Sequence, residues 1–224
     1  MLIAVACVLA APLPAIGDDD AATWPQWRGP TRDGQCAKAS AAWPESFREH
    51  LALAWRVADL GPSYAGPIVA ADRVFTVETR GKREEIVRAF DRQTGSPVWT
   101  ARWGGSMSVP FFARKNGSWV RSTPAHDEAG KRLYVGGMRD VLVCLDAKTG
   151  DVVWRCDFME RFGTDLPAFG LSCSPLVAGD YVHVQAAASL VKLDKKTGEV
   201  LWRALEDGGG MNESAFSSFV LAEI

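Results

Sequence analysis

Three histidines are the residues in this sequence best suited to acid–base chemistry near neutral pH, and each stands alone. They are His50, His126 and His183. A histidine that acts as a general base needs a partner group in the fold, and none is adjacent in the sequence. His183 alternates with Val182 and Val184, so its side chain faces away from theirs in an expected strand. We therefore expect structural roles for the histidines and predict no catalytic residue.

The cysteines are equally isolated. Four of them follow residue 17, namely Cys36, Cys144, Cys156 and Cys173. They form no C-x-x-C pair and no cluster with histidine, so their spacing does not predict a structural zinc site. Cys144 and Cys156 flank one expected hairpin, whose turn would instead pair Cys144 with a residue near Val153. The sequence predicts buried free thiols and no metal-binding residue.

Two insertions between expected strands, at residues 104–119 and 157–169, combine aromatic and basic side chains. Loops on a rigid scaffold often carry function. The candidate contact residues are Phe111, Phe112, Arg114, Lys115, Phe158, Met159, Arg161 and Phe162. Two interpretations stay open: a surface that contacts a partner, or insertions that pack over neighbouring strands.

A pattern D-x-x-T-G-x-x-x-W occurs three times and organises the strands that would position these loops. Its copies begin at Asp91, Asp146 and Asp194, which are 55 and 48 residues apart. This spacing is close to the period of about 40 to 50 residues found in propeller blades. The aspartate can accept backbone N–H bonds, and the glycine supplies the positive φ of a hairpin loop with a bulge. We expect the tryptophan to fill the space between one sheet and the next.

Two further strands are expected before each hairpin, the first of them marked by a proline. The proline-marked runs are 64–70, 121–125 and 171–178, and the second strands are 73–78, 132–136 and 181–185. Each unit then has four strands. We predict an all-β propeller with blades at about 64–103, 120–157 and 171–204, and both insertions on one face near its central axis.

The two ends of the chain differ from the repeats. Residues 1–17 form an apolar leader with a small-residue cleavage site, which is typical of a signal peptide and too short for a membrane-spanning helix. Residues 18–50 are a turn-rich approach segment, and 51–224 are the partial propeller. The strand expected at 51–57 carries Trp55 and would complete the last blade. Residues 214–224 begin a further blade, and since a propeller has at least about four blades, we expect a fragment of a longer protein.

Charge and composition narrow the function classes. The formal net charge is −2 and 47% of the residues are apolar. These values indicate a globular chain with no electrostatic reason to bind nucleic acid or an anionic membrane surface. Together with the leader, they predict an exported protein that is periplasmic or extracellular.

The repeat resembles a known family motif. Residues 89–99 read A-F-D-R-Q-T-G-S-P-V-W, which is similar to the tryptophan-docking motif A-x-D-x-x-T-G-x-x-x-W of the pyrroloquinoline quinone (PQQ) repeat family. The other copies match except that Cys144 and Lys192 replace the alanine. The opening W-P-Q-W-R-G-P at 24–30 is similar to the start of exported PQQ-like propellers. The resemblance covers about residues 24–224 and implies the propeller fold.

The family that the motif resembles contains two functional classes. Quinoprotein dehydrogenases oxidise alcohols or sugars with PQQ and calcium, and typically place two adjacent cysteines against the quinone. Other members are noncatalytic, such as the lipoprotein subunit of the outer-membrane β-barrel assembly machine. This sequence has no Cys-Cys pair, and no local spacing of Glu160, Asp165, Asn212 or Glu213 matches a calcium site.

The sequence therefore predicts a noncatalytic, exported propeller that binds a protein or envelope partner through its loop face. No cofactor-binding residue is predicted. The alternative is a fragment of a PQQ- and calcium-dependent alcohol or sugar dehydrogenase, whose remaining blades supply the ligands.

Overall fold

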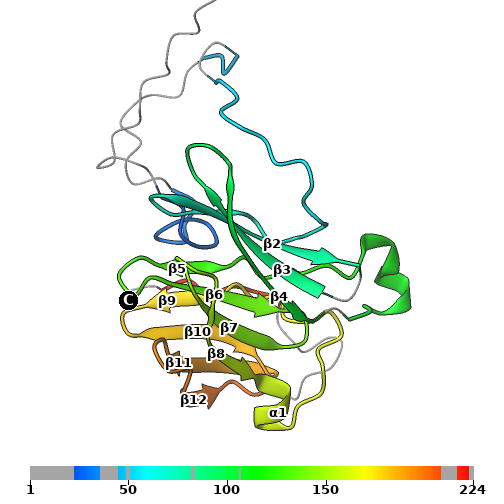
Figure 1. The fold of residues 1–224 in the computed structure, drawn as a ribbon. Helices are drawn as coiled ribbons and strands as arrows, with labels where there is room; N and C mark the ends of the chain where they lie inside the picture. Colours follow the sequence, from blue (N-terminus) through cyan, green and yellow to red (C-terminus); the bar gives the residue numbers. More distant parts are fainter. Residues whose placement is uncertain are drawn as a thin grey trace, which may run out of the picture.

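The computed structural model of the chain describes residues 23–35, 45–48, 51–81, 84–105, 107–207 and 216–221. Its strands form three antiparallel sheets of four strands, each with neighbours in sequence order (Figure 1). The first sheet contains β1 (Ile68–Val69), β2 (Arg73–Arg80), β3 (Glu84–Asp91) and β4 (Pro97–Gly104). The second contains β5 (Ala125–Asp127), β6 (Arg132–Gly137), β7 (Val141–Asp146) and β8 (Val152–Asp157). The third contains β9 (Leu176–Ala178), β10 (Tyr181–Ala186), β11 (Ser189–Asp194) and β12 (Val200–Ala204). The predicted four-stranded blades are confirmed.

The turn between the third and fourth strands of each blade is built as its repeat predicts. In the first blade, Asp91 Oδ1 accepts the backbone N–H groups of Gln93 and Thr94 at 3.0 and 2.8 Å. Gly95 follows at φ 71°, where a side chain would be strained. Asp146 and Asp194 accept the corresponding bonds in the second and third blades.

The repeat tryptophans join neighbouring blades. Trp99 of the first blade lies on the turn of the second, where its Nε1–H donates to Ala147 O at 3.0 Å. Trp154 makes the same contact with Lys195 O of the third blade at 3.2 Å. Each ring covers the turn glycine so closely that a Cβ there would lie 2.6 Å from it. The predicted role between sheets is confirmed, and the apolar cores also lie between consecutive blades.

The first strand of each blade is shorter than predicted. Strands were expected to begin at residues 64, 121 and 171, but β1, β5 and β9 each begin directly after a proline. The residues before the proline bond to the neighbouring blade instead of to their own sheet. Tyr64 N–H, for example, donates to Val120 O at 2.8 Å. These segments therefore line the border between blades, where the first strands of the sheets adjoin.

The segment at 23–35 crosses three blades rather than leading up to one. Trp24 pairs with Val69 of β1, and Pro25 O accepts the N–H of His126 in β5 at 2.7 Å. Arg32, which is 1% exposed, donates to Pro175 O at 2.7 Å and to Ser174 O at 3.1 Å. Burial lowers the pKa of Arg32 to about 10. This segment thus fastens the first strands of all three blades together.

Residues 51–60 have no strand assignment, so the strand expected at 51–57 is not formed with the described residues. Trp55 nevertheless docks as a repeat tryptophan does. Its Nε1–H donates to Arg92 O at 2.8 Å, and its ring covers Gly95. This is the contact that a blade preceding the first would make, and the closure of a ring through 51–57 stays a prediction.

Several other predictions lie wholly or partly outside the described residues: the leader at 1–17, much of 18–50 with Cys36 and His50, and residues 214–215 and 222–224 of the expected further blade. Cys144, Cys156 and Cys173 are buried and free, as predicted. No helix among the described residues is long and apolar enough to cross a membrane.

Candidate functional site

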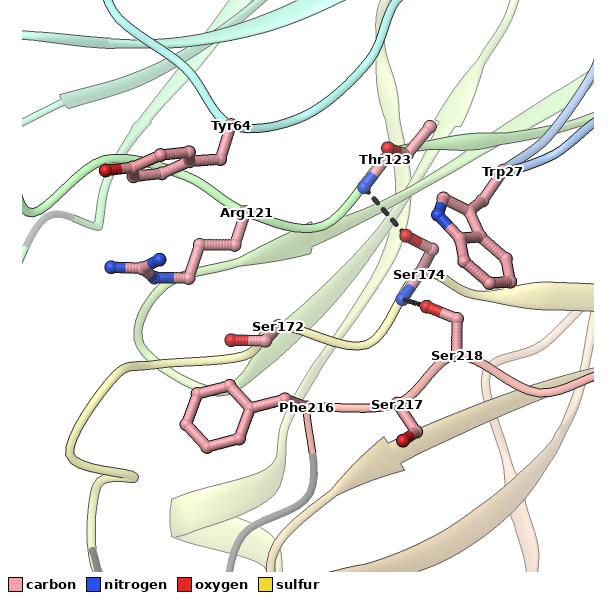
Figure 2. A pocket seen from close by; sticks show the side chains of 9 residues that line it. All are labelled: Trp27, Tyr64, Arg121, Thr123, Ser172, Ser174, Phe216, Ser217 and Ser218. Carbon is pink, nitrogen blue, oxygen red and sulfur yellow. Dashed lines mark hydrogen bonds between the residues drawn. The ribbon is translucent and has the colours of Figure 1, made fainter. Parts of the chain in front are cut away.

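A cavity of about 350 Å³ opens where the first strands of the blades adjoin. Its lining comes from the segments just before β1, β5 and β9, from residues 216–218 and from the N-terminal segment (Figure 2). We call it the axial cavity, lined by Trp27, Tyr64, Arg121, Thr123, Ser172, Ser174, Phe216, Ser217 and Ser218. Because equivalent positions of successive blades contribute, the repeat itself creates this site.

Hydroxyl groups connect the blades along one wall of the axial cavity. Thr123 Oγ1 accepts the N–H of Gly66 at 3.0 Å, and Ser174 Oγ accepts the N–H of Thr123 at 3.0 Å. Ser218 Oγ in turn accepts the N–H of Ser174 at 2.9 Å. Figure 2 shows the last two of these bonds in sequence. Each blade therefore supplies an acceptor to the blade before it, which fixes the wall without a continuous sheet.

Arg121 is the charged residue of the axial cavity lining. Its guanidinium lies over the Tyr64 ring at 4.7 Å and over the Phe169 ring at 5.8 Å, and its Nε–H donates to Phe169 O at 3.2 Å. Burial lowers the pKa of Arg121 from its ordinary value, although the group stays cationic at neutral pH. The tyrosine hydroxyl donates to Asn116 O, so the aromatic face that holds the guanidinium is itself held in place.

Four aromatic side chains linked by successive ring contacts, one of them in the cavity lining, form the aromatic rim of this cavity. The rim consists of Phe111, Phe112, Phe169 and Phe216. Phe111 and Phe112 begin the 3₁₀-helix η1 (Phe111–Asn116) and are 79% and 57% exposed. Phe112 contacts Phe169 with ring centroids 6.3 Å apart, and Phe169 contacts Phe216 at 5.4 Å. The exposed cations Arg114 and Lys115 follow directly in η1.

The eight candidate contact residues from the sequence differ in exposure in the structure. Phe111, Phe112, Arg114 and Lys115 are exposed, which leaves them available for the predicted contact surface. Phe158 is fully buried, so for this residue the packing interpretation holds and the contact interpretation does not. It begins α1 (Phe158–Phe162) and packs in the core between the second and third blades, with Phe162 stacked on it at 6.4 Å.

The helix α1 serves mainly as a cover for the outer strands. It contacts β7 and β8, and Arg203 of β12 lies over the Phe162 ring at 4.7 Å. Figure 1 shows α1 and the green segment around residues 107–119 at the same end of the sheets, as predicted. Neither α1 nor η1 contributes to the axial cavity lining, and η1 approaches it through the contact of Phe112 with Phe169, so the predicted position of both insertions near the axis stays a prediction. Arg161 is exposed and Met159 is half-buried.

Sequence reasoning missed Tyr64, Arg121, Phe169 and Phe216. A signal was available for two of them, because Tyr64 and Arg121 each stand three residues before the proline that marks the first strand. Aligning the blades on these prolines also brings Ser172 to the same position. Because the three residues at this position are of different types, the repeat pattern did not identify the position as a site.

The two described histidines, His126 and His183, each pack against aromatic rings. His126 lies against the Phe75 ring at 5.5 Å, and burial lowers its pKa despite Glu128 at 3.5 Å from its Nδ1. His183 lies between the Tyr181 and Trp202 rings at 6.5 and 6.2 Å, and burial lowers its pKa as well. Within the described ranges, no three histidine, cysteine or acidic residues gather as metal ligands would.

A match to a protein family agrees with this geometry. The family described as outer membrane protein assembly factor BamB, whose unit is the PQQ-like repeat, matches residues 83–223. The chain belongs to this family. Among curated proteins, none matches it significantly.

Solved structures share the blade architecture at low sequence identity. A europium-containing methanol dehydrogenase is 16% identical with a TM-score of 0.54, and the match covers 84% of this chain and 32% of that one. A quinohemoprotein alcohol dehydrogenase from Comamonas testosteroni is 22% identical with a TM-score of 0.54, covering 81% and 27%. BamB from Moraxella catarrhalis is 19% identical with a TM-score of 0.47, covering 68% and 39%. The chain thus spans less than two fifths of each of these proteins, and the first two likenesses show a β-propeller fold.

The described lining of the axial cavity does not fit the calcium ion of the PQQ- and calcium-dependent alternative. Calcium takes six to eight oxygen ligands, among them carboxylates. The lining offers serine and threonine hydroxyls and the cation of Arg121, and it contains no acidic side chain. Glu160 and Asp165 are exposed elsewhere, and Asn212 and Glu213 lie outside the described residues. We derive no catalytic step from this site.

Proposed function

We propose that this chain belongs to a noncatalytic, exported propeller that binds a protein partner through the aromatic rim of the axial cavity. The rim is the observation that carries the proposal. Phe111, Phe112 and Phe216 are each more than half exposed, and they are linked through Phe169 into one surface. Contiguous exposed aromatic side chains of this kind mark interaction sites.

The charges beside the rim favour a particular partner chemistry. Arg114 and Lys115 are exposed next to Phe111 and Phe112, and Arg121 lies over the Phe169 ring that Phe112 contacts. An apolar segment that also carries acidic residues complements this surface. The family's description as an outer membrane protein assembly factor supports a protein partner, and the leader at residues 1–17 supports export.

Site-specific photo-crosslinking in the native host tests the proposal. A photoreactive phenylalanine analogue replaces Phe112 in the full-length protein. The matched control places it at Val152 of β8, which is 59% exposed and apolar but far from the rim in sequence and blade position. We expect one discrete adduct from position 112, lost when Phe111→Ser is added, and none from position 152.

Equal adducts from both positions, or none from position 112, would contradict the proposal. Circular dichroism of each variant establishes that the blades stay folded. Because Phe111 is 79% exposed, its replacement by serine should leave stability nearly unchanged.

A further inference from the structure

The axial cavity holds more hydrogen-bond donors than its neighbours use. Thr123 Oγ1 and Ser174 Oγ each accept one backbone N–H, and neither hydroxyl donates to another described residue. A hydroxyl has one proton to donate besides its accepting lone pairs. Two O–H donors on the cavity wall therefore remain available.

Ser172 adds a third donor at the position equivalent to Arg121. Its Oγ is buried and makes no hydrogen bond within the described part of the chain. Buried polar atoms are nearly always paired, so an unpaired one calls for a partner. Figure 2 shows the Ser172 hydroxyl on the same side of the cavity as the Arg121 guanidinium.

Arg121 supplies the charge. Its Nε–H is used by Phe169 O, whereas its two Nη groups make no hydrogen bond to any described residue. The Tyr64 and Phe169 rings hold the guanidinium from its faces, which leaves its donor edge free. Among the described residues that line the cavity, none is acidic, so none neutralises the guanidinium. A rigid cation with free, parallel N–H groups matches a carboxylate in shape and charge.

We infer that the axial cavity receives a carboxylate side chain of the protein partner, while apolar residues beside that carboxylate cover Phe112 and Phe216. This inference rests on the proposed function, since it names the group that anchors the partner in the same site. The cavity of about 350 Å³ has room for a glutamate or aspartate side chain. Arg121 forms the ion pair, and the Ser172 hydroxyl, on the same side of the cavity in Figure 2, donates to the same carboxylate, while the Thr123 and Ser174 hydroxyls lie along the opposite wall.

A pair of matched peptides tests the anchor on the full-length protein. The probes are N-acetyl-Phe-Glu amide and its neutral isostere N-acetyl-Phe-Gln amide, titrated by calorimetry and by the NMR signal of the Arg121 Nε–H group. We expect the glutamate peptide to shift this signal and to bind about tenfold more tightly than the glutamine peptide, because a hydrogen-bonded charge is lost in the latter.

Variants separate the cavity from the charge of the surface. Arg121→Gln should abolish the preference for glutamate, Arg121→Lys should keep part of it, and Ser172→Ala should reduce it severalfold. Lys148→Gln is the control, because Lys148 is an exposed cation in the turn between β7 and β8, outside both the aromatic rim and the cavity lining. It should keep the full preference. Thermal unfolding of each variant shows that the blades remain intact.

Three outcomes would overturn the inference. They are equal binding of the two peptides, a glutamate preference that survives Arg121→Gln, and an Arg121 signal that responds to micromolar free PQQ with calcium but not to millimolar peptide. The last would assign the carboxylate to a small molecule. If the crosslinked adduct at position 112 persists under any of these outcomes, the rim remains a partner surface and only the inference of a carboxylate anchor is wrong. Absence of that adduct would contradict the proposed function itself.

Discussion

Replacing Gly150 by alanine should destabilise the contact between the first and second blades. Gly150 has φ 81°, and a Cβ there would lie 2.6 Å from Cε3 of Trp99. The left-handed backbone costs an alanine about 1 kcal/mol relative to glycine. Displacing the indole adds about 1 to 3 kcal/mol of overpacking and weakens its 3.0 Å bond to Ala147 O, worth about 1 kcal/mol. We expect a total loss of about 3 kcal/mol or more.

Gly179→Ala is the matched control. Gly179 also has positive φ, at 57°, but a Cβ there meets nothing within 4 Å. It should lose only the backbone contribution of about 1 kcal/mol. Urea unfolding of the full-length protein, followed by circular dichroism, measures both variants. In a Trp99→Ala background, Gly150→Ala should cost no more than the control, because the two residues are coupled. Losses equal to within about 0.5 kcal/mol in the wild-type background would refute the docking argument.

Two further predictions concern buried charges. Asp140 accepts the N–H of Ala187 in the next blade at 2.8 Å, and burial, with a smaller contribution from Asp157, raises its pKa to about 6. The folded state then binds this proton more tightly than the unfolded state, so stability should fall as pH rises from about 4 to about 6, by about 3 kcal/mol in all. Asp140→Asn should flatten the dependence of stability on pH, measured by denaturation across this range. Asparagine is a suitable replacement because it tolerates the φ of 55° at this position. An unchanged slope would show that the Asp140 carboxyl is not its cause. Arg32→Met should cost about 3 kcal/mol because it leaves the carbonyls of Ser174 and Pro175 without their donor. The exposed Arg28→Met should cost under about 1 kcal/mol in the same thermal melts, and equal losses would show that Arg32 does not fasten the blades.

The blade was predictable because its signals are local. Asp91, Gly95 and Trp99 lie within nine residues. In the structure the aspartate accepts backbone N–H groups, the glycine takes a positive φ, and the tryptophan docks on the next blade, as their residue types predict. The lengths of the first strands were not predictable in this way. Whether Tyr64 bonds to its own sheet or to Val120 depends on the neighbouring blade, which lies more than 50 residues away.

The axial cavity was harder to predict than the blades. Arg121 contacts the rings of Tyr64 and Phe169, which come from different blades, and although Tyr64 holds the equivalent position in its own blade, the spacing does not reveal that the two side chains meet. The contact of Arg32 with Pro175 spans 143 residues. From the sequence alone, an arginine in a turn-rich segment is expected to be exposed. Arg32 is buried because the fold brings the carbonyl groups of Ser174 and Pro175 to it.

The noncatalytic role is tested most directly by titrating the full-length protein with PQQ and calcium. Tryptophan fluorescence follows binding, and reduction of an acceptor dye with simple alcohols follows turnover. The account predicts no saturable binding at micromolar PQQ and no alcohol-dependent dye reduction. Saturable, calcium-dependent binding together with dye reduction would contradict it and assign the protein to the quinoprotein dehydrogenases.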